Sequence, residues 1–251
     1  MSAGSSFASN RIAAQLWSAR LDLLQSGSGL VLVLFMWVHM FLVSSILVSE
    51  TAMYRVAKMF EGYYFFGRSY PWLVSSVVAV IFALLMLHAA LALRKFPHDS
   101  GQFFRFRAHK LRMHHGDTTL WWWQVVTGFL LFFLAPMHLF GMFSQPDQIG
   151  PYASSWRVYS THWPLYLVLL FVVELHGAIG LYRLVVKWVS FPQASTRTWR
   201  TRLTVLKWGL SVFFIALGLA TLVAYYQIGA SLRDHPTRVF EPRSAVAEIR
   251  Q

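Results

Sequence analysis

Hydrophobic residues in this chain fall into five long, nearly uninterrupted runs that are separated by polar segments. Each run is long enough to cross about 30 Å of hydrocarbon as a helix, whereas strands of a membrane barrel are about half as long and alternate with polar residues. The pattern therefore predicts an all-α integral membrane protein, a bundle of five transmembrane helices. Their approximate limits are residues 27–48, 72–93, 120–143, 163–188 and 206–227. No internal repeat is evident, so we expect a single membrane domain over residues 1–251.

Composition agrees with a membrane protein, because 56% of the 251 residues are hydrophobic and only 13% are charged. The formal net charge of +12 could suggest a nucleic-acid partner, but the basic residues gather at the ends of the apolar runs. There they are better explained as a signal of membrane topology, so no nucleic acid is expected. The chain has no cysteine, which excludes disulfides, thiolate metal sites and cysteine-bound iron–sulfur clusters within it.

Lysine and arginine are distributed unequally between the two sides of the predicted bundle. Fourteen of the 22 precede the first run or lie in and beside the segments after the second and fourth runs, if Arg183, Lys187 and Lys207 at the run ends are included, and eight lie on the other side. The side that is richer in basic residues is usually cytoplasmic. We therefore expect a multi-pass protein of the cell inner membrane, with its N-terminus in the cytoplasm and its C-terminus outside. No cleaved signal peptide is expected, because a polar segment precedes the first run.

Four of the ten histidines lie inside four different apolar runs, namely His39, His88, His138 and His176. A single buried histidine is more often a hydrogen-bonded packing residue than a metal ligand. Four of them in four spans fit a bundle that holds haem between facing helices, where each iron takes two imidazoles. Two b-type haems are therefore expected, and neither is covalently attached, because no Cys-x-x-Cys-His is present.

Depth along the helices separates the two haems but does not pair all four histidines. His88 falls near the cytoplasmic end of its run and His138 near the outer end of its own. His39 and His176 both fall near mid-membrane. One haem toward each membrane face is therefore expected, and the residues alone leave the pairing open.

A metal transporter is the main alternative for four membrane histidines. Such sites usually place Asp or Glu beside histidine at helical spacing, and here Glu174 is the one intramembrane acid. It stands two residues from His176, which directs it to a different side of the helix. The many Phe, Trp, Leu and Met residues also suit a flat apolar macrocycle better than a hydrated ion path. Glu174 itself should be protonated or functional, because an unpaired acid at that depth is costly.

Longer motifs accompany these histidines in order along residues 21–225. They are Leu-Asp-Leu-Leu-Gln-Ser-Gly-Ser-Gly (21–29), Phe-Met-Trp-Val-His-Met-Phe (35–41), His-Ala-Ala-Leu-Ala-Leu-Arg-Lys-Phe-Pro (88–97), His-Gly-Asp-Thr-Thr-Leu-Trp-Trp (115–122), Gln-Pro-Asp-Gln-Ile-Gly-Pro (145–151), Trp-Pro-Leu-Tyr-Leu-Val-Leu-Leu-Phe (163–171), and Val-Glu-Leu-His-Gly followed by Gly-Leu-Tyr-Arg-Leu (173–184). Through them the chain resembles the cytochrome b subunits of dihaem quinol:fumarate reductases, within the succinate:quinone oxidoreductases.

The resemblance implies the membrane subunit of a menaquinol:fumarate reductase, which would be inactive on fumarate alone. Menaquinol would be oxidised near the outer face, and its electrons would pass through the two haems to an iron–sulfur subunit. A flavoprotein subunit would then reduce fumarate. The resemblance leaves open a dimer of such heterotrimers. From charge and topology, the soluble subunits would dock on the basic cytoplasmic loops at residues 105–112 and 197–202.

The resemblance also implies how the haems are held. His88 and His176 would bind the proximal haem, near the cytoplasm. His39 and His138 would bind the distal haem, near the outer face. Propionate contacts are implied for Gln25, Ser26, Trp121 and Lys187 at the proximal haem and for Ser154 and Arg157 at the distal one. Interfacial anchoring is the ordinary explanation for such Lys, Arg and Trp residues.

Two acids receive roles in proton transfer through the same resemblance. Glu61 would lie at the outer menaquinol site and accept a proton from the quinol, although an isolated Glu between helices is ordinarily a solvated loop residue. Glu174 would belong to a proton path through the bundle.

Two other functional classes stay open. A dihaem cytochrome b could serve another oxidoreductase, such as a hydrogenase or a formate dehydrogenase, and a co-purifying flavoprotein would argue against that. The same subunit could also work with succinate oxidation. A non-redox, histidine-lined carrier would lack the optical spectrum of a bis-histidine haem b.

Overall fold

The structure of the chain, a computed structural model, describes residues 3–95, 99, 101, 102, 104, 105, 108, 116–192 and 195–242. This described part is helical and contains no strand. Five of its helices are long and apolar enough to cross a membrane, which confirms the predicted fold class. They are α1 (Ala3–Val43), α4 (Pro71–Leu93), α6 (Gly116–Ser144), α8 (Trp163–Trp188) and α9 (Thr196–Ser231). Most of the predicted docking loop at 105–112 lies outside the described residues.

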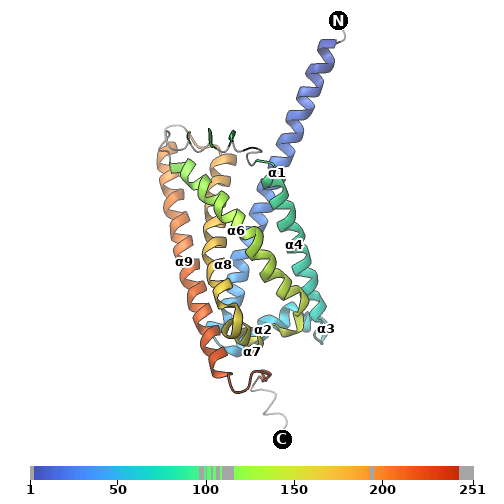
Figure 1. The fold of residues 1–251 in the computed structure, drawn as a ribbon, viewed down its shortest axis with the longest axis vertical. Coiled ribbons are helices and arrows are strands. Elements are labelled where there is room, and N and C mark those ends of the chain that lie inside the picture. The colour runs from blue at the N-terminus through green and yellow to red at the C-terminus, as the bar shows by residue number, and fades with distance from the viewer. Residues whose placement is uncertain are drawn as a thin grey trace.

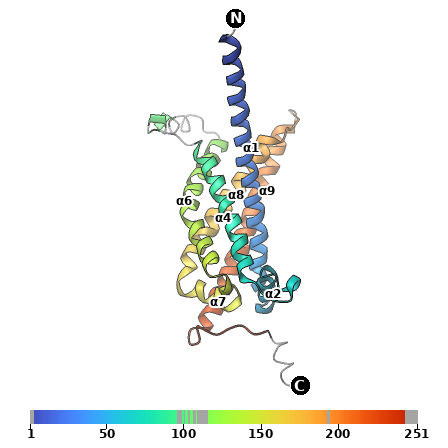
Figure 2. The ribbon, with the colours of Figure 1, turned by 90° about the vertical axis from the view of Figure 1, so that its right-hand side faces the viewer.

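Four of these helices form a ring around the centre of the bundle. α1 and α6 each pack on both α4 and α8, and α9 lies outside the ring against α8 and α1. Successive long helices run in opposite directions, so that α1 begins and α9 ends at opposite ends of the bundle (Figure 1). The first part of α1 projects beyond the other helices (Figure 2).

The ends of the long helices differ from the limits of the apolar runs. α1 begins at Ala3 rather than near residue 27, and α9 begins at Thr196 rather than near residue 206. The hydropathy of the sequence identifies only the part of a helix that crosses lipid, so it does not predict a polar extension of the same helix. α4 begins at Pro71, where the missing N–H costs no helical hydrogen bond, and α6 continues through Pro136.

Short helical elements cover the end of the bundle at which α1 finishes. They are η1 (Ser44–Leu47), α2 (Glu50–Phe60), α3 (Tyr63–Phe66), η2 (Pro146–Gln148), α7 (Pro151–Arg157) and the π-helical turn η3 (Val158–His162). The Ser49 hydroxyl caps α2 by accepting the Ala52 N–H at 3.0 Å. Gly62 and Gly67 flank α3 with φ of 76° and 70°, the left-handed conformation that favours glycine. Two tight turns therefore set the path from α2 into α4.

Large apolar side chains cover the outside of the helices. Val80 on α4 and Val212 on α9 are each 67% exposed, and Phe133 on α6 is 54% exposed. Such a surface suits lipid rather than water. The chain is accordingly a multi-pass membrane protein.

Candidate functional site

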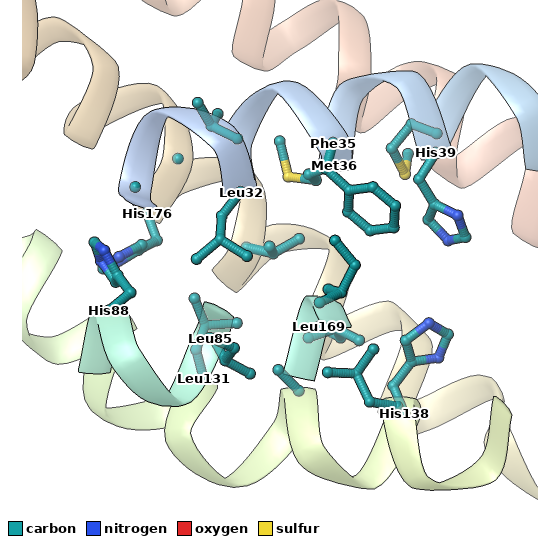
Figure 3. Close-up of a pocket in the computed structure, with 18 of the residues that line it drawn as sticks. Leu32, Phe35, Met36, His39, Leu85, His88, Leu131, His138, Leu169 and His176 are labelled. Carbon is teal, nitrogen blue, oxygen red and sulfur yellow. The ribbon is translucent and has the colours of Figure 1, made fainter. Parts of the chain in front are cut away.

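A cavity of about 1270 Å³ lies within the bundle, and all four helices of the ring contribute to its wall. This volume exceeds the range of about 300–1,000 Å³ that is usual for small-molecule sites. One end contains His39 and His138, and the other contains His88 and His176 (Figure 3). The wall between them includes Leu32, Phe35, Met36, Leu85, Leu131 and Leu169. The cavity is thus apolar along its length, with two histidines at each end.

The histidines meet in two pairs, which we name by the haem that the resemblance implies for each. In the proximal pair, the ring centroids of His88 on α4 and His176 on α8 are 6.4 Å apart and the planes are at 90°. In the distal pair, those of His39 on α1 and His138 on α6 are 6.1 Å apart at 57°. Metal–imidazole bonds are about 2.0–2.1 Å long, so two imidazoles on opposite sides of one ion have centroids roughly 6 Å apart. Both pairs have the separation that such an ion requires.

Backbone hydrogen bonds orient the two rings of the proximal pair. The Nδ1–H of His88 donates to the carbonyl of Gln25 at 3.2 Å. The Nδ1–H of His176 donates to the carbonyl of Gln124 at 3.1 Å. A carbonyl oxygen only accepts, so Nδ1 carries the proton in both rings and Nε2 keeps its lone pair. Metal-binding histidines are usually oriented in this way.

The distal pair has aromatic neighbours instead. The ring of His39 is stacked on Phe35 at 5.8 Å between centroids, and the ring of His138 meets Tyr166 edge-on at 5.4 Å. The Nδ1 of His138 is buried and has no hydrogen-bond partner among the described residues. An unpaired buried polar atom costs about 1–3 kcal/mol. The ring of His138 is thus held by packing rather than by a hydrogen bond at Nδ1, which distinguishes it from the two rings of the proximal pair.

The residues assigned to propionate contacts all belong to the cavity wall. They are Gln25, Ser26, Trp121, Ser154, Arg157 and Lys187. At the proximal end three basic side chains surround one acid, because Asp22 pairs with Arg94, Lys95 and Lys187 at 3.0, 2.9 and 3.1 Å. Three cations against one carboxylate leave positive charge at this end of the cavity. That charge favours an acidic group of a bound molecule.

Glu61 lies at the end of α2, and its side chain is only 4% exposed. Its Oε2 accepts a hydrogen bond from Lys58 Nζ at 2.6 Å. Its own carbonyl accepts the Tyr70 N–H at 2.8 Å, which fixes the backbone. Phe60, the residue before it, lines the cavity, whereas Glu61 lies just outside the wall. Burial and an ion pair exclude the solvated loop residue that an isolated Glu would ordinarily be.

Glu174 is 1% exposed and lies on a different side of α8 from His176. Its Oε2 accepts a hydrogen bond from Trp37 Nε1 at 3.1 Å, and the Trp37 ring is stacked on Phe214 of α9 at 5.2 Å. Val173 and His176 face the cavity, but Glu174 faces α1 and α9. Among the described residues, no three His, Asp or Glu side chains are grouped as a metal site. The acid and the histidine therefore belong to separate environments, as their spacing predicts.

Comparisons with known proteins agree with this arrangement. The profile of the family described as succinate dehydrogenase/fumarate reductase transmembrane subunit matches residues 105–217. The fumarate reductase cytochrome b subunit of Helicobacter pylori (strain J99) is 51% identical over 224 residues, which cover 89% of this chain and 86% of that protein. The chain belongs to the family of fumarate reductase cytochrome b subunits. The fumarate reductase cytochrome b subunit of Wolinella succinogenes is 50% identical to this chain over 217 residues, which cover 86% of this chain and 85% of that protein.

Several residues of this chain contribute to the site although the sequence did not predict a role for them. The hydroxyls of Ser28 and Thr127 each lie 3.2 Å from the Nδ1 of a proximal histidine. Lys58 pairs with Glu61, and Lys95 joins the cations of the proximal end. The spacing of three residues could have indicated Lys58, because residues three apart are neighbours on a helix. No local pattern marks Trp37 as the partner of an acid on another helix.

Proposed function

We propose that this chain is the dihaem membrane subunit of a menaquinol:fumarate reductase, assembled with an iron–sulfur subunit and a flavoprotein subunit. The observation that carries the proposal is the two histidine pairs, with ring centroids 6.4 and 6.1 Å apart, inside one apolar cavity. The similar proteins that are named fumarate reductase cytochrome b subunits support the choice of complex.

Each histidine pair holds one b haem. When bound, the haems supply the one-electron chemistry that links quinol to the iron–sulfur subunit. The chain itself supplies an apolar wall, which excludes water and strengthens every charge contact inside. Lys95 and Lys187 at one end and Arg157 at the other bind the propionates as charge-assisted hydrogen-bond donors. Their position at the two ends of the cavity supports one haem toward each end.

Glu61 accepts a proton when menaquinol is oxidised. The supporting observations are its burial beside the cavity and its contact with Lys58, which holds the carboxylate oxygen at 2.6 Å. The distal pair lies nearer to this end than the proximal pair does, because α2 lines the cavity where α1 finishes. Quinol oxidation and proton release therefore occur at the end of the bundle away from the iron–sulfur subunit.

The partner subunits bind at the opposite end, which faces the cytoplasm. The cations around Asp22 lie at that end, beside the proximal pair. Most lysines and arginines of the chain belong to the same side in the predicted topology. Electrons thus leave the membrane where a soluble subunit has a basic surface to bind.

Glu174 carries protons between the two ends of the bundle, and Trp37 holds its Oε2 in place. A Glu174→Gln substitution is expected to leave both haems in place and to slow quinol-dependent fumarate reduction at least about tenfold, because an amide does not relay a proton. The rate is measured in proteoliposomes together with proton movement. Glu50→Gln, the same change at an acid on α2, is the control and should retain most of the rate. A wild-type rate of quinol-dependent fumarate reduction in Glu174→Gln would contradict the proposed role of Glu174 in proton transfer.

The proposed function is tested on the complex purified through a tag on this chain. We expect a flavoprotein and an iron–sulfur protein to co-purify, with two b haems per chain and fumarate reduction driven by a menaquinol analogue. Haem content is measured from the reduced-minus-oxidised optical spectrum. A preparation without haem b would reject the proposal, and so would a haem-containing preparation without a flavoprotein.

A further inference from the structure

α1 and α6 carry the same spaced motif, and each copy contacts a histidine of the proximal pair. Gln-x-x-Ser-Gly occupies residues 25–29 and Gln-x-x-Thr-Gly occupies residues 124–128. In both helices a histidine of the distal pair follows the Gln by 14 residues. Fourteen residues span just under four helical turns and about 21 Å, so motif and histidine lie on nearly the same side of each helix. Each helix therefore serves both ends of the cavity.

The motif on α1 contacts His88 of the neighbouring helix α4. The carbonyl of Gln25 and the hydroxyl of Ser28 are both 3.2 Å from the Nδ1 of His88. The hydroxyl donates its own hydrogen to the Gln25 carbonyl at 3.1 Å, so its lone pair is available to the Nδ1–H. A Cβ at Gly29 would lie 2.9 Å from the Cε1 of His88. Glycine thus lets the imidazole rest directly on the backbone of α1.

The motif on α6 makes the same contacts with His176 of α8. The Gln124 carbonyl lies 3.1 Å and the Thr127 hydroxyl 3.2 Å from the Nδ1 of His176. The hydroxyl donates to the Trp123 carbonyl at 2.7 Å, which again leaves a lone pair for the Nδ1–H. A Cβ at Gly128 would lie 3.0 Å from the Cε1 of His176. Both proximal histidines are therefore held by a carbonyl, a hydroxyl and a glycine in the same order.

We propose that these two motifs are matched cradles that position the axial ligands of the proximal haem. Each cradle fixes the Nδ1–H tautomer, sets the ring orientation and makes Nε2 a stronger ligand. A hydroxyl in a helix commonly bonds only to the preceding turn. That common hydrogen bond alone does not explain why α1 and α6 each place a carbonyl, a hydroxyl and a glycine, in the same order, against a histidine of the proximal pair. The proposal rests on the proposed function, which supplies the haem.

The distal pair is the internal reference for this proposal. His39 and His138 lie on the cradle helices themselves, and the Nδ1 of His138 has no partner among the described residues. Removing a cradle hydroxyl should therefore affect one haem and spare the other. A general loss of packing would affect both.

The hydroxyls are tested in the intact complex with Ser28→Ala and Thr127→Val, by optical redox titration that resolves the two haems. A weaker Nδ1–H bond makes the imidazole a poorer donor to ferric iron, so the proximal haem should become easier to reduce. We expect a roughly tenfold higher reduced-to-oxidised ratio at a fixed ambient potential, which corresponds to about 59 mV for one electron. The distal haem should not move, and Thr127→Ser should restore the wild-type value. Thr221→Val is the matched control, because Thr221 is equally buried but bonds to Ser44 at 2.8 Å.

The glycines are tested with Gly29→Ala and Gly128→Ala. Each added methyl group would push a ring that two hydrogen bonds hold in place, so we expect loss of the proximal haem with the distal haem retained. Gly27→Ala and Gly141→Ala are the controls on the same two helices, because a Cβ at either position meets no described atom within 4 Å. They should keep both haems.

Three results would contradict the proposal that the two cradles position the ligands of the proximal haem. One is an unchanged proximal potential in Ser28→Ala and Thr127→Val with both haems present. Another is an equal shift of both haems, or the same shift in Thr221→Val. The third is full haem content in Gly29→Ala and Gly128→Ala. If the glycine variants do not assemble, the hydroxyl variants decide alone. Failure of the proposed function is separate, because the wild type itself would then lack bis-histidine haem b.

Discussion

Replacing His176 with alanine is expected to halve the haem b content of the purified complex and to abolish quinol-dependent fumarate reduction. The remaining imidazole of the proximal pair, His88, lies across the cavity, and no other described histidine is paired with either ring. His88 and His176 would hold the proximal haem together, so His88 alone would not retain it. Haem content and redox-titrated spectra measure the effect. His235→Ala, a change at an exposed histidine outside the cavity, should leave both haems in place.

Double variants test which histidines share a haem. Because His88 and His176 have ring centroids 6.4 Å apart, His88→Ala combined with His176→Ala should lose no more haem than either change alone. His138→Ala combined with His176→Ala should lose both haems, since these residues belong to different pairs. If the first combination removed both haems and the second only one, the assignment of the pairs would be wrong.

The five membrane helices were predictable because lipid imposes a simple demand. A helix that crosses it needs about 20 apolar residues in a row, and each of the five runs meets that length. The short elements α2, α3 and α7 follow no such rule, and their positions depend on turns at Gly62, Gly67 and similar points. The polar beginnings of α1 and α9 were missed for the same reason.

The histidines could be selected from the sequence, but their partners could not. Depth gave no pairing because His39 and His176 both fall near mid-membrane, and pairing depends on how each helix is rotated. The resemblance implies the same two pairs that the structure brings together, and their binding of haem stays a prediction. The Ser28 contact with His88 joins residues 60 apart. In the sequence, a serine or threonine among apolar residues predicts only a hydrogen bond from its hydroxyl to the backbone of its own helix.

Glu61→Gln is expected to lower quinol-dependent fumarate reduction at least about 100-fold while both haems remain bound. A positioned general base typically contributes about 10²–10⁴-fold, and the neutral amide has nearly the same shape but accepts no proton. The side chain is only 4% exposed, so water has little access to replace it. The rate with a menaquinol analogue is compared with the rate from an artificial donor that reduces the iron–sulfur subunit directly. The second rate should be unchanged.

Two further variants separate the acid from its surroundings. Glu50→Gln changes an acid at the other end of the same helix and should keep the quinol rate. Lys58→Met removes the 2.6 Å partner but leaves Glu61 in place, and it should keep a measurable quinol rate. A lysine ammonium has three donors and no acceptor, so Lys58 cannot take the quinol proton in place of Glu61. If Glu61→Gln kept most of the quinol rate, another group at the outer end of the cavity would have to be the proton acceptor.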